Sequence, residues 1–144
     1  MLWFLFTLFI FYGALIPFDF VFDNDLIANK IRNLNWVPFV RADGSRHSIP
    51  DMVQNVLFFI PFGFLGVLSF AKNKFFAVFL VTFFGFIISL NIEILQLLTS
   101  NRNTTVTDLA CNTIGGAIGA ITAFIVFAIF CLLMKSSSFQ RTFN

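Results

Sequence analysis

Long runs of apolar residues, separated by short polar segments, dominate the pattern of this chain. Four runs are long enough, or nearly so, to supply the roughly 17–25 residues that a helix needs to cross the hydrocarbon core of a bilayer. Polar and apolar residues do not alternate within them, whereas the strands of a membrane barrel alternate over about ten residues. The pattern therefore predicts an all-α integral membrane bundle of four transmembrane helices, at about residues 2–18, 53–71, 75–98 and 109–134.

The polar segment between the first two runs is much longer than the others and has a pattern of its own. Leu26 or Ile27, then Ile31 and Leu34, recur at helical spacing, and Asn24 or Asp25 is placed to cap the start of a helix. Basic residues lie off this apolar stripe. The pattern is typical of a short helix that lies in the membrane interface.

Composition supports a membrane protein. The chain is 58% hydrophobic and 11% charged, with 24 phenylalanines, whereas a soluble domain has about 45–50% apolar and about 25% charged residues. No repeat or linker divides the sequence, so we expect a single domain over residues 1–144. Cys111 and Cys131 are about 30 Å apart along one predicted helix and cannot pair. We expect no metal site, since no cluster of cysteine and histidine exists. We also expect no cofactor and no nucleic-acid partner.

Basic residues near the helix ends bear on orientation. Four helices place the N-terminus, the turn around residue 73 and the C-terminal tail on one side of the membrane. That side carries Lys72, Lys74, Lys135 and Arg141, and the other carries Lys30, Arg32, Arg41, Arg46 and Arg102. The first set is concentrated and free of acids, whereas the second is mixed with six aspartates. We therefore expect both termini in the cytoplasm.

Polar residues inside the apolar runs gather towards one membrane face. Glu93 is the only glutamate of the chain, and it lies on one helix face with Gln96, which follows it by three residues. An ionisable group costs at least about 2.5–3.5 kcal/mol at the bilayer centre and needs a partner, for which Arg102 is the nearest cation, with Arg41 or Arg46 as alternatives. The predicted topology brings together seven candidate ligand-binding residues: Arg41, Asn55, Glu93, Gln96, Arg102, Asp108 and Asn112.

A purely structural explanation has to be weighed against a functional one. Buried polar side chains also join membrane helices, at about 0.6 kcal/mol for each hydrogen bond. Gly115 and Gly119 form a GxxxG pattern, which allows close helix approach and could serve a homo-oligomer. Amides and hydroxyls suffice to join helices, so a carboxylate with an arginine nearby favours a functional cluster.

These residues stand in an order that resembles the VanZ-like family. The matching pieces are "NWVPF" (35–39), "NVLFFIPFG" (55–63), Glu93 with Gln96, Arg102, and "TDLACNTIGGAIG" (107–119). The resemblance implies a multi-pass protein of the bacterial cell (inner) membrane with a role in the envelope. The family takes its name from a member linked to resistance to the glycopeptide teicoplanin. Members often carry further aspartates just before the one at 108, but Thr105 and Thr107 stand here, which weakens a carboxylate-rich metal site.

Three kinds of function remain open. The first is a binding or accessory protein that holds an anionic lipid or cell-wall precursor headgroup, with arginine as the phosphate ligand. The second is a membrane enzyme acting on a lipid-linked phosphate or headgroup, with Glu93 as general acid or base and Asp108 as the other catalytic candidate. The third is a small transporter, which the apolar far half of the helices disfavours.

Overall fold

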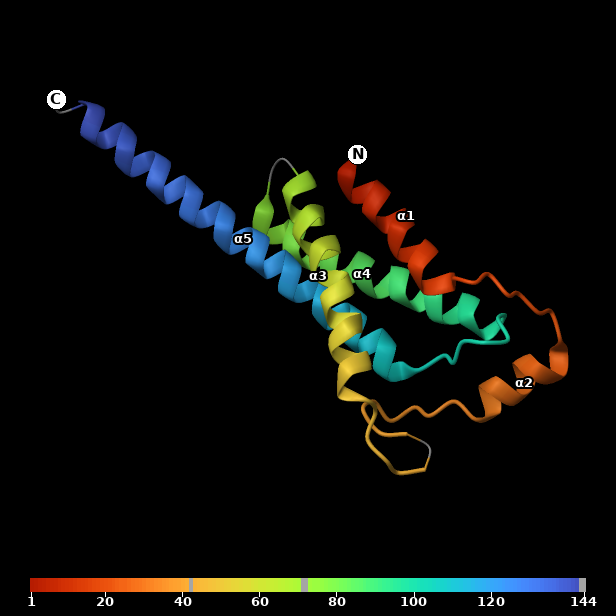
Figure 1. Cartoon of the computed structure of the whole chain (residues 1–144). Coiled ribbons are helices and arrows are strands. Elements are labelled where there is room, and N and C mark those ends of the chain that lie inside the picture. Colours follow the sequence, from red (N-terminus) through yellow and green to blue (C-terminus); the bar gives the residue numbers. More distant parts are fainter. Residues whose placement is uncertain (42, 71–72, 143–144) are drawn as a thin grey trace.

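The computed structural model describes residues 1–41, 43–70 and 73–142, with side chains as far as residue 135. This part of the chain contains five helices joined by loops. No strand is present in that part. The helices are α1 (Leu2–Leu15), α2 (Asn24–Arg32), α3 (Ile49–Ser69), α4 (Lys74–Leu97) and α5 (Val106–Thr142). The predicted all-helical fold is therefore confirmed (Figure 1). Lys72 and the side chain of Arg141, both used to predict the orientation, lie outside the described residues.

Three helices are long and apolar enough to cross a membrane: Ile49–Ser69, Lys74–Leu97 and the segment Val106–Lys135 of α5. The first predicted span is shorter than expected, because α1 ends at Leu15 and not at residue 18. Pro17 disfavours helical geometry at the preceding residue, Ile16, which is extended. With 14 residues, α1 is about 21 Å long, so a fourth complete crossing stays a prediction.

The short helix expected in the first loop is present as α2, but its cap is Asp23, which precedes both candidates. The side chain of Asp23 accepts hydrogen bonds from the backbone N–H groups of Asp25, at 2.9 Å, and Leu26, at 3.4 Å. An aspartate at this position satisfies N–H groups that have no partner within the helix. The position of α2 at a membrane interface remains a prediction.

The backbones of α3 and α5 approach closely because glycines line their contact. A Cβ atom built on Gly63 would collide with the carbonyl oxygen of Gly116 in α5. Cβ atoms on Gly115 and Gly119 would collide with the carbonyl oxygens of Val56 and Ile60 in α3. The GxxxG face is thus filled within the chain. Homo-oligomerisation stays a prediction, and a different surface would have to support it.

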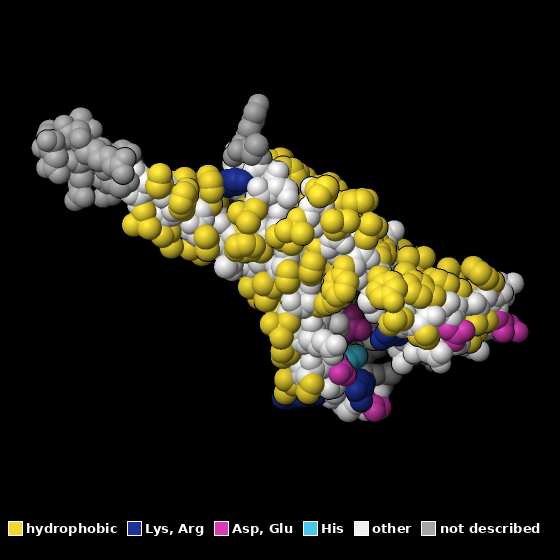
Figure 2. All heavy atoms as spheres, turned by 45° about the horizontal axis from the view of Figure 1, so that its top comes forward, with side chains coloured by type: hydrophobic (Ala, Val, Ile, Leu, Met, Phe, Trp, Pro, Cys, Tyr) yellow, Lys and Arg dark blue, Asp and Glu magenta, His cyan; other side chains and the backbone are white. Residues whose placement is uncertain are grey.

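Aromatic side chains fill the contacts among α1, α3 and α4. The ring of Trp3 lies 5.4 Å from that of Phe62, and Phe59 and Phe62 are almost fully buried. Most other large apolar side chains point outwards over the surface of the bundle, and Figure 2 shows them covering the visible face. Apolar side chains on the outside suit a lipid solvent, since lipid tails are as apolar as the side chains themselves.

Candidate functional site

Most of the residues predicted to gather lie around one cavity at one end of the bundle. A cavity of about 430 Å³ lies among the ends of α1, α3, α4 and α5 and the segment that joins α4 to α5. Six of the seven candidate residues line it: Asn55, Glu93, Gln96, Arg102, Asp108 and Asn112. We call this space the polar cavity. Its volume falls within the range of about 300–1,000 Å³ that is usual for small-molecule sites.

Glu93 has a different partner from the one expected. Its side chain is buried, with 4% exposed, and Oε2 accepts a hydrogen bond from the backbone N–H of Thr105 at 2.8 Å. Arg102, the predicted cation, donates instead to the carbonyl oxygen of Ile16 at 3.0 Å. Thr105 immediately precedes α5, where backbone N–H groups lack helical partners and the helix dipole favours negative charge. The start of α5 therefore supplies the hydrogen-bond partner of Glu93 that Arg102 was expected to be.

Thr105 also holds Asp108 at the start of α5. Its Oγ1 accepts a hydrogen bond from the backbone N–H of Asp108 at 2.9 Å, as the first residue of a capping box does. The carboxylate of Asp108 accepts a hydrogen bond from Nδ2 of Asn55 at 2.6 Å, which ties α3 to α5. A threonine at position 105 is thus explained by its role as the cap of α5.

Two further candidates make hydrogen bonds between helices. Nδ2 of Asn112 donates to Oγ of Ser89 at 2.9 Å, between α5 and α4. Nε2 of Gln96 donates to the carbonyl oxygen of Ala14 at 3.0 Å, between α4 and α1. These bonds hold the walls of the polar cavity in place, so both residues have a structural role.

Arg41, the seventh candidate, lies outside the polar cavity but lines a hollow next to it. This hollow, of about 560 Å³, shares Asn55, Arg102 and Asp108 with the polar cavity, and we call it the loop hollow. His47 lines it as well and is half-buried. Figure 2 shows acidic, basic and histidine side chains together in this recess between apolar surfaces.

Lys30 is a polar residue whose position the sequence did not reveal. Its Nζ donates hydrogen bonds to the carbonyl oxygens of Gln96 at 3.0 Å, Arg102 at 2.7 Å and Thr99. Burial lowers the pKa of this ammonium from its usual 10.5. Carbonyls at the end of a helix have no helical partner and attract a cation, so Lys30 fastens α2 to the end of α4. The one signal in the sequence was its place near the end of a short amphipathic helix.

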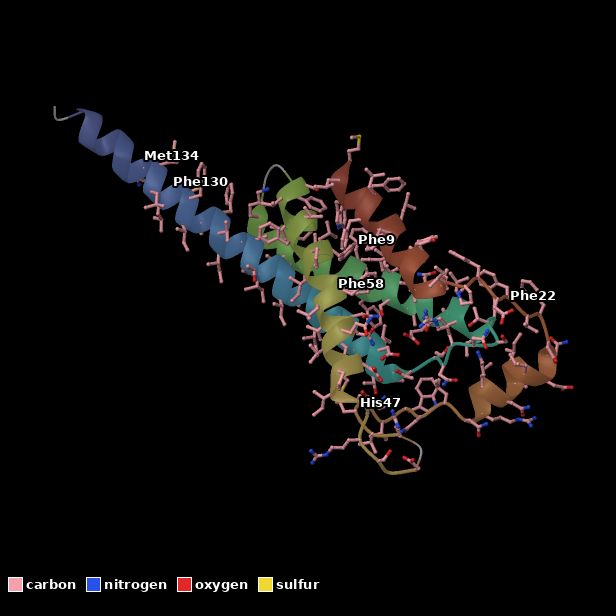
Figure 3. The ribbon with its side chains drawn as sticks, in the orientation of Figure 1. Phe9, Phe22, His47, Phe58, Phe130 and Met134 are labelled. Carbon is pink, nitrogen blue, oxygen red and sulfur yellow. The ribbon has the colours of Figure 1, made fainter. Side chains whose placement is uncertain are left out.

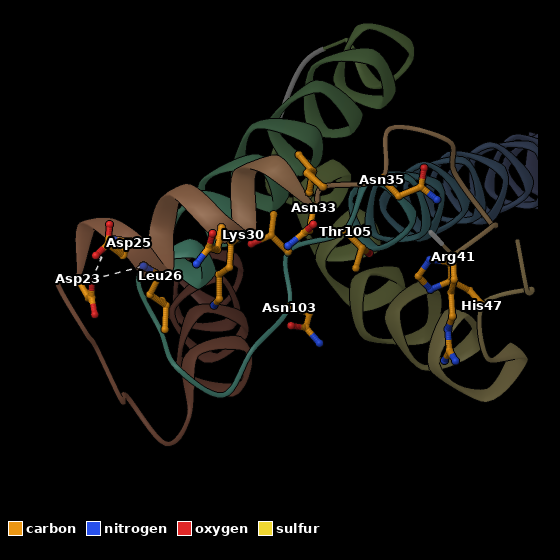
Figure 4. Close-up of a pocket in the computed structure, with 13 residues that line it drawn as sticks. Asp23, Asp25, Leu26, Lys30, Asn33, Asn35, Arg41, His47, Asn103 and Thr105 are labelled. Atoms are coloured by element: carbon orange, nitrogen blue, oxygen red, sulfur yellow. Dashed lines mark hydrogen bonds between the residues drawn. The ribbon is translucent and has the colours of Figure 1, made fainter. Parts of the chain in front are cut away.

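A third space, of about 620 Å³, lies between α2 and the segments that border the loop hollow. Figure 4 shows Lys30 on α2, Arg41 and His47 on the following loop, and Asn103 and Thr105 just before α5. Four of its lining residues also line the loop hollow, namely Arg41, His47, Asn103 and Thr105. The three spaces therefore adjoin one another at the polar end of the bundle, from α2 to the polar cavity.

The charged groups around these spaces have both signs. The polar cavity and the loop hollow carry the carboxyl groups of Asp51, Glu93 and Asp108 and the basic groups of Arg41 and Arg102. Within the described residues, no three side chains of His, Cys, Asp or Glu come close enough to hold a metal ion. The arrangement suits a polar or charged group that hydrogen bonds to amides and a guanidinium.

The fold and the site define a class: a helical membrane protein with a polar cavity at one end of its bundle. Within that class the chain belongs to the VanZ/LLP1 family, whose sequence profile matches residues 3–139. The protein named Protein VanZ from Enterococcus faecium is 36% identical over 88 residues, which cover 61% of this chain and 50% of that relative. The chain thus spans about half the length of the curated relative that it matches. No solved structure matches the chain.

Family membership confirms the resemblance drawn from the ordered motifs and supports a VanZ-like envelope protein of the membrane.

Proposed function

We propose that the protein binds the headgroup of an anionic lipid or of a lipid-linked cell-wall precursor in the polar cavity. The main support for this proposal is that six polar or charged residues line one cavity of ligand size. They come from α3, α4, α5 and the segment that joins α4 to α5. Arg102 borders both the polar cavity and the loop hollow, and Arg41 borders the hollow. A phosphate group between them would meet two guanidinium groups, which bind phosphate through paired N–H donors.

The setting of Glu93 is the reason that we prefer binding to catalysis. One of its carboxylate oxygens is bonded to the backbone at the start of α5, which gives the residue a structural role. The alternative is an enzyme acting on a lipid-linked phosphate with Glu93 as general acid or base. A Glu93→Gln substitution separates the two, since glutamine keeps the shape and the acceptor oxygen but cannot exchange a proton at neutral pH.

Envelope location and antibiotic resistance complete the proposal. The relative from Enterococcus faecium carries the name Protein VanZ, and the family that it resembles takes its name from a member linked to teicoplanin resistance. We place the chain in the bacterial cell membrane with the polar cavity on the outer side, where a precursor headgroup could reach it. Resistance would then follow from binding of the precursor and would need Arg102.

The direct test is native mass spectrometry of the protein purified from bacterial membranes in mild detergent. We expect a bound lipid or lipid-linked precursor on the wild type and on Glu93→Gln, and its loss from Arg102→Ala. Arg32→Ala is the matched control, because Arg32 is an exposed arginine of α2. If Arg102→Ala and Arg32→Ala retain the same bound species, the binding proposal is wrong. If Glu93→Gln instead accumulates a species that the wild type turns over, the enzyme alternative holds.

A drug-susceptibility assay tests the link to resistance. We expect the wild type to raise the teicoplanin concentration that a sensitive host tolerates, and Arg102→Ala to remove this increase while Arg32→Ala keeps it. Equal tolerance with and without the wild-type protein would contradict that part of the proposal.

A further inference from the structure

One wall of the polar cavity is apolar, although a polar headgroup alone would not require an apolar wall. Phe9 and Gly13 of α1 line it together with Phe58 and Phe59 of α3. These apolar residues face the amides and charged groups of the same cavity. Figure 3 shows Phe9 and Phe58 where α1 and α3 come together, with polar side chains further along the bundle. The cavity is therefore amphipathic.

The aromatic wall continues to the outer surface of the bundle. The rings of Phe9 and Phe58 lie 5.6 Å apart across α1 and α3. Phe9 is 52% exposed, so one ring borders both the cavity and the surrounding solvent, which at this part of a membrane bundle is lipid. The Phe58 ring packs closely against α1 at Gly13, since a Cβ atom on Gly13 would lie 3.1 Å from Cζ of Phe58. A larger side chain at position 13 would have to displace that ring.

We infer that the polar cavity opens sideways into the bilayer between α1 and α3, and that its ligand is a membrane lipid whose hydrocarbon chain leaves over Phe9 and Phe58. This inference rests on the proposed binding function and narrows its ligand to a molecule with the chain attached. Ligand sites are usually lined by apolar side chains that match the ligand, with few polar groups to orient it. A headgroup without its chain would leave the aromatic wall exposed to water, which is unfavourable.

The first test compares ligands that share a headgroup and differ in their chains. Dioleoyl phosphatidylglycerol, dihexanoyl phosphatidylglycerol and glycerol phosphate are titrated onto the purified protein and followed by native mass spectrometry. We expect the dioleoyl lipid to bind at least about tenfold more tightly than glycerol phosphate, because burial of two methylene groups already supplies that factor. Gly13→Leu should reduce this preference, because the added side chain must displace the Phe58 ring of the aromatic wall. Thr122→Leu adds bulk to an exposed position of α5 and should keep the preference.

The outcomes separate this inference from the proposed function. If wild-type protein binds all three compounds equally, or if Gly13→Leu and Thr122→Leu behave alike, the sideways opening is wrong while headgroup binding stands. If no compound binds and no anionic lipid or precursor is retained from membranes, both proposals fall together.

A second measurement needs no variant. Phosphatidylglycerol with a photoreactive diazirine near the end of one chain is bound to the wild-type protein, illuminated, and its attachment sites are mapped by peptide mass spectrometry. We expect labelling to concentrate in residues 9–14 and 54–59, and excess unlabelled dioleoyl phosphatidylglycerol to suppress it. Labelling spread equally over the exposed apolar surface of residues 121–133 would overturn the inference.

Discussion

Thr105 and Glu93 show how one junction can replace an ion pair. The backbone N–H of Thr105 satisfies the buried carboxylate, and its side chain caps the helix that follows. The hydroxyl of Thr104 also donates to the carbonyl oxygen of Glu93 at 2.9 Å. Two groups from two consecutive residues thus join α4 to the start of α5, and a third caps α5 itself. Because the backbone N–H of Thr105 satisfies the carboxylate, Arg102 borders the polar cavity without pairing with Glu93.

Substitution of Glu93 tests this junction. We expect Glu93→Leu to lower the free energy of unfolding by about 1–3 kcal/mol, because the N–H of Thr105 loses its buried acceptor. Glu93→Gln should lower it by less than about 1 kcal/mol, since the amide oxygen still accepts that hydrogen bond. Unfolding of the purified protein by dodecyl sulfate, followed by circular dichroism, measures both. Equal stability of the two variants would show that the hydrogen bond contributes nothing.

At the scale of helices, the contact between α3 and α5 depends on which glycine of a neighbouring pair is changed. Gly115 faces the carbonyl of Val56, so a methyl group there has to push two backbones apart. Gly116 is the next residue, yet a Cβ on it would meet only the ring of Phe62, at an ordinary 3.9 Å. The pair offers a close comparison of the same substitution on two faces of one helix.

We expect Gly115→Ala to destabilise the protein by about 1–3 kcal/mol, the usual cost of overpacking a tight contact. Gly116→Ala should be neutral or slightly stabilising, because alanine is the better helix former by about 1 kcal/mol. The same dodecyl sulfate titration distinguishes them. A Gly115→Ala variant as stable as Gly116→Ala would mean that α3 and α5 are further apart than described.

The sequence predicts the helices better than it predicts their partners. Each apolar run is a local signal, so the long helices could be placed within about four residues, except that α5 continues to Thr142 and not to residue 134. The gathering of Asn55, Glu93 and Asp108 followed from counting helix directions, which needs no side-chain geometry. The partner of Glu93 and the contacts of Lys30 could not be foreseen, because both depend on how loops fold back over helix ends. The Leu15 end of α1 was missed because Pro17 was counted as part of the apolar run.

At the scale of the whole molecule, two lysines used to predict orientation have structural partners. Lys30 is bonded to carbonyls at the end of α4. At the opposite end of the bundle, Nζ of Lys74 donates to the carbonyl oxygens of Val67 at 3.0 Å, Leu68 at 3.3 Å and Phe70, where α3 ends. Each lysine has this structural role on whichever side of a membrane it lies, so neither one indicates orientation. The prediction of orientation then depends on the remaining basic residues.

Cysteine labelling tests the proposed orientation. In a chain with Cys111 and Cys131 replaced by serine, we expect Ser45→Cys in the long loop to react with a membrane-impermeant maleimide added to intact cells. Lys135→Cys in α5 should react only after the membrane is opened, because the C-terminal end is placed in the cytoplasm. Both positions are exposed. The reverse labelling pattern would invert the topology and place the polar cavity on the cytoplasmic side.

The unequal lengths of the helices affect the lipid around them. The apolar segment of α5 has 30 residues and is about 45 Å long, so it must tilt or project beyond a hydrocarbon core of about 30 Å. In contrast, α1 reaches only about 21 Å, and a bilayer adapts to so short a segment by thinning. Hydrophobic mismatch would therefore bring the headgroup layer down beside α1, at the place where Phe9 and Gly13 border the polar cavity. A lipid entering there would have less of the bilayer's thickness to cross before its headgroup reached Arg102.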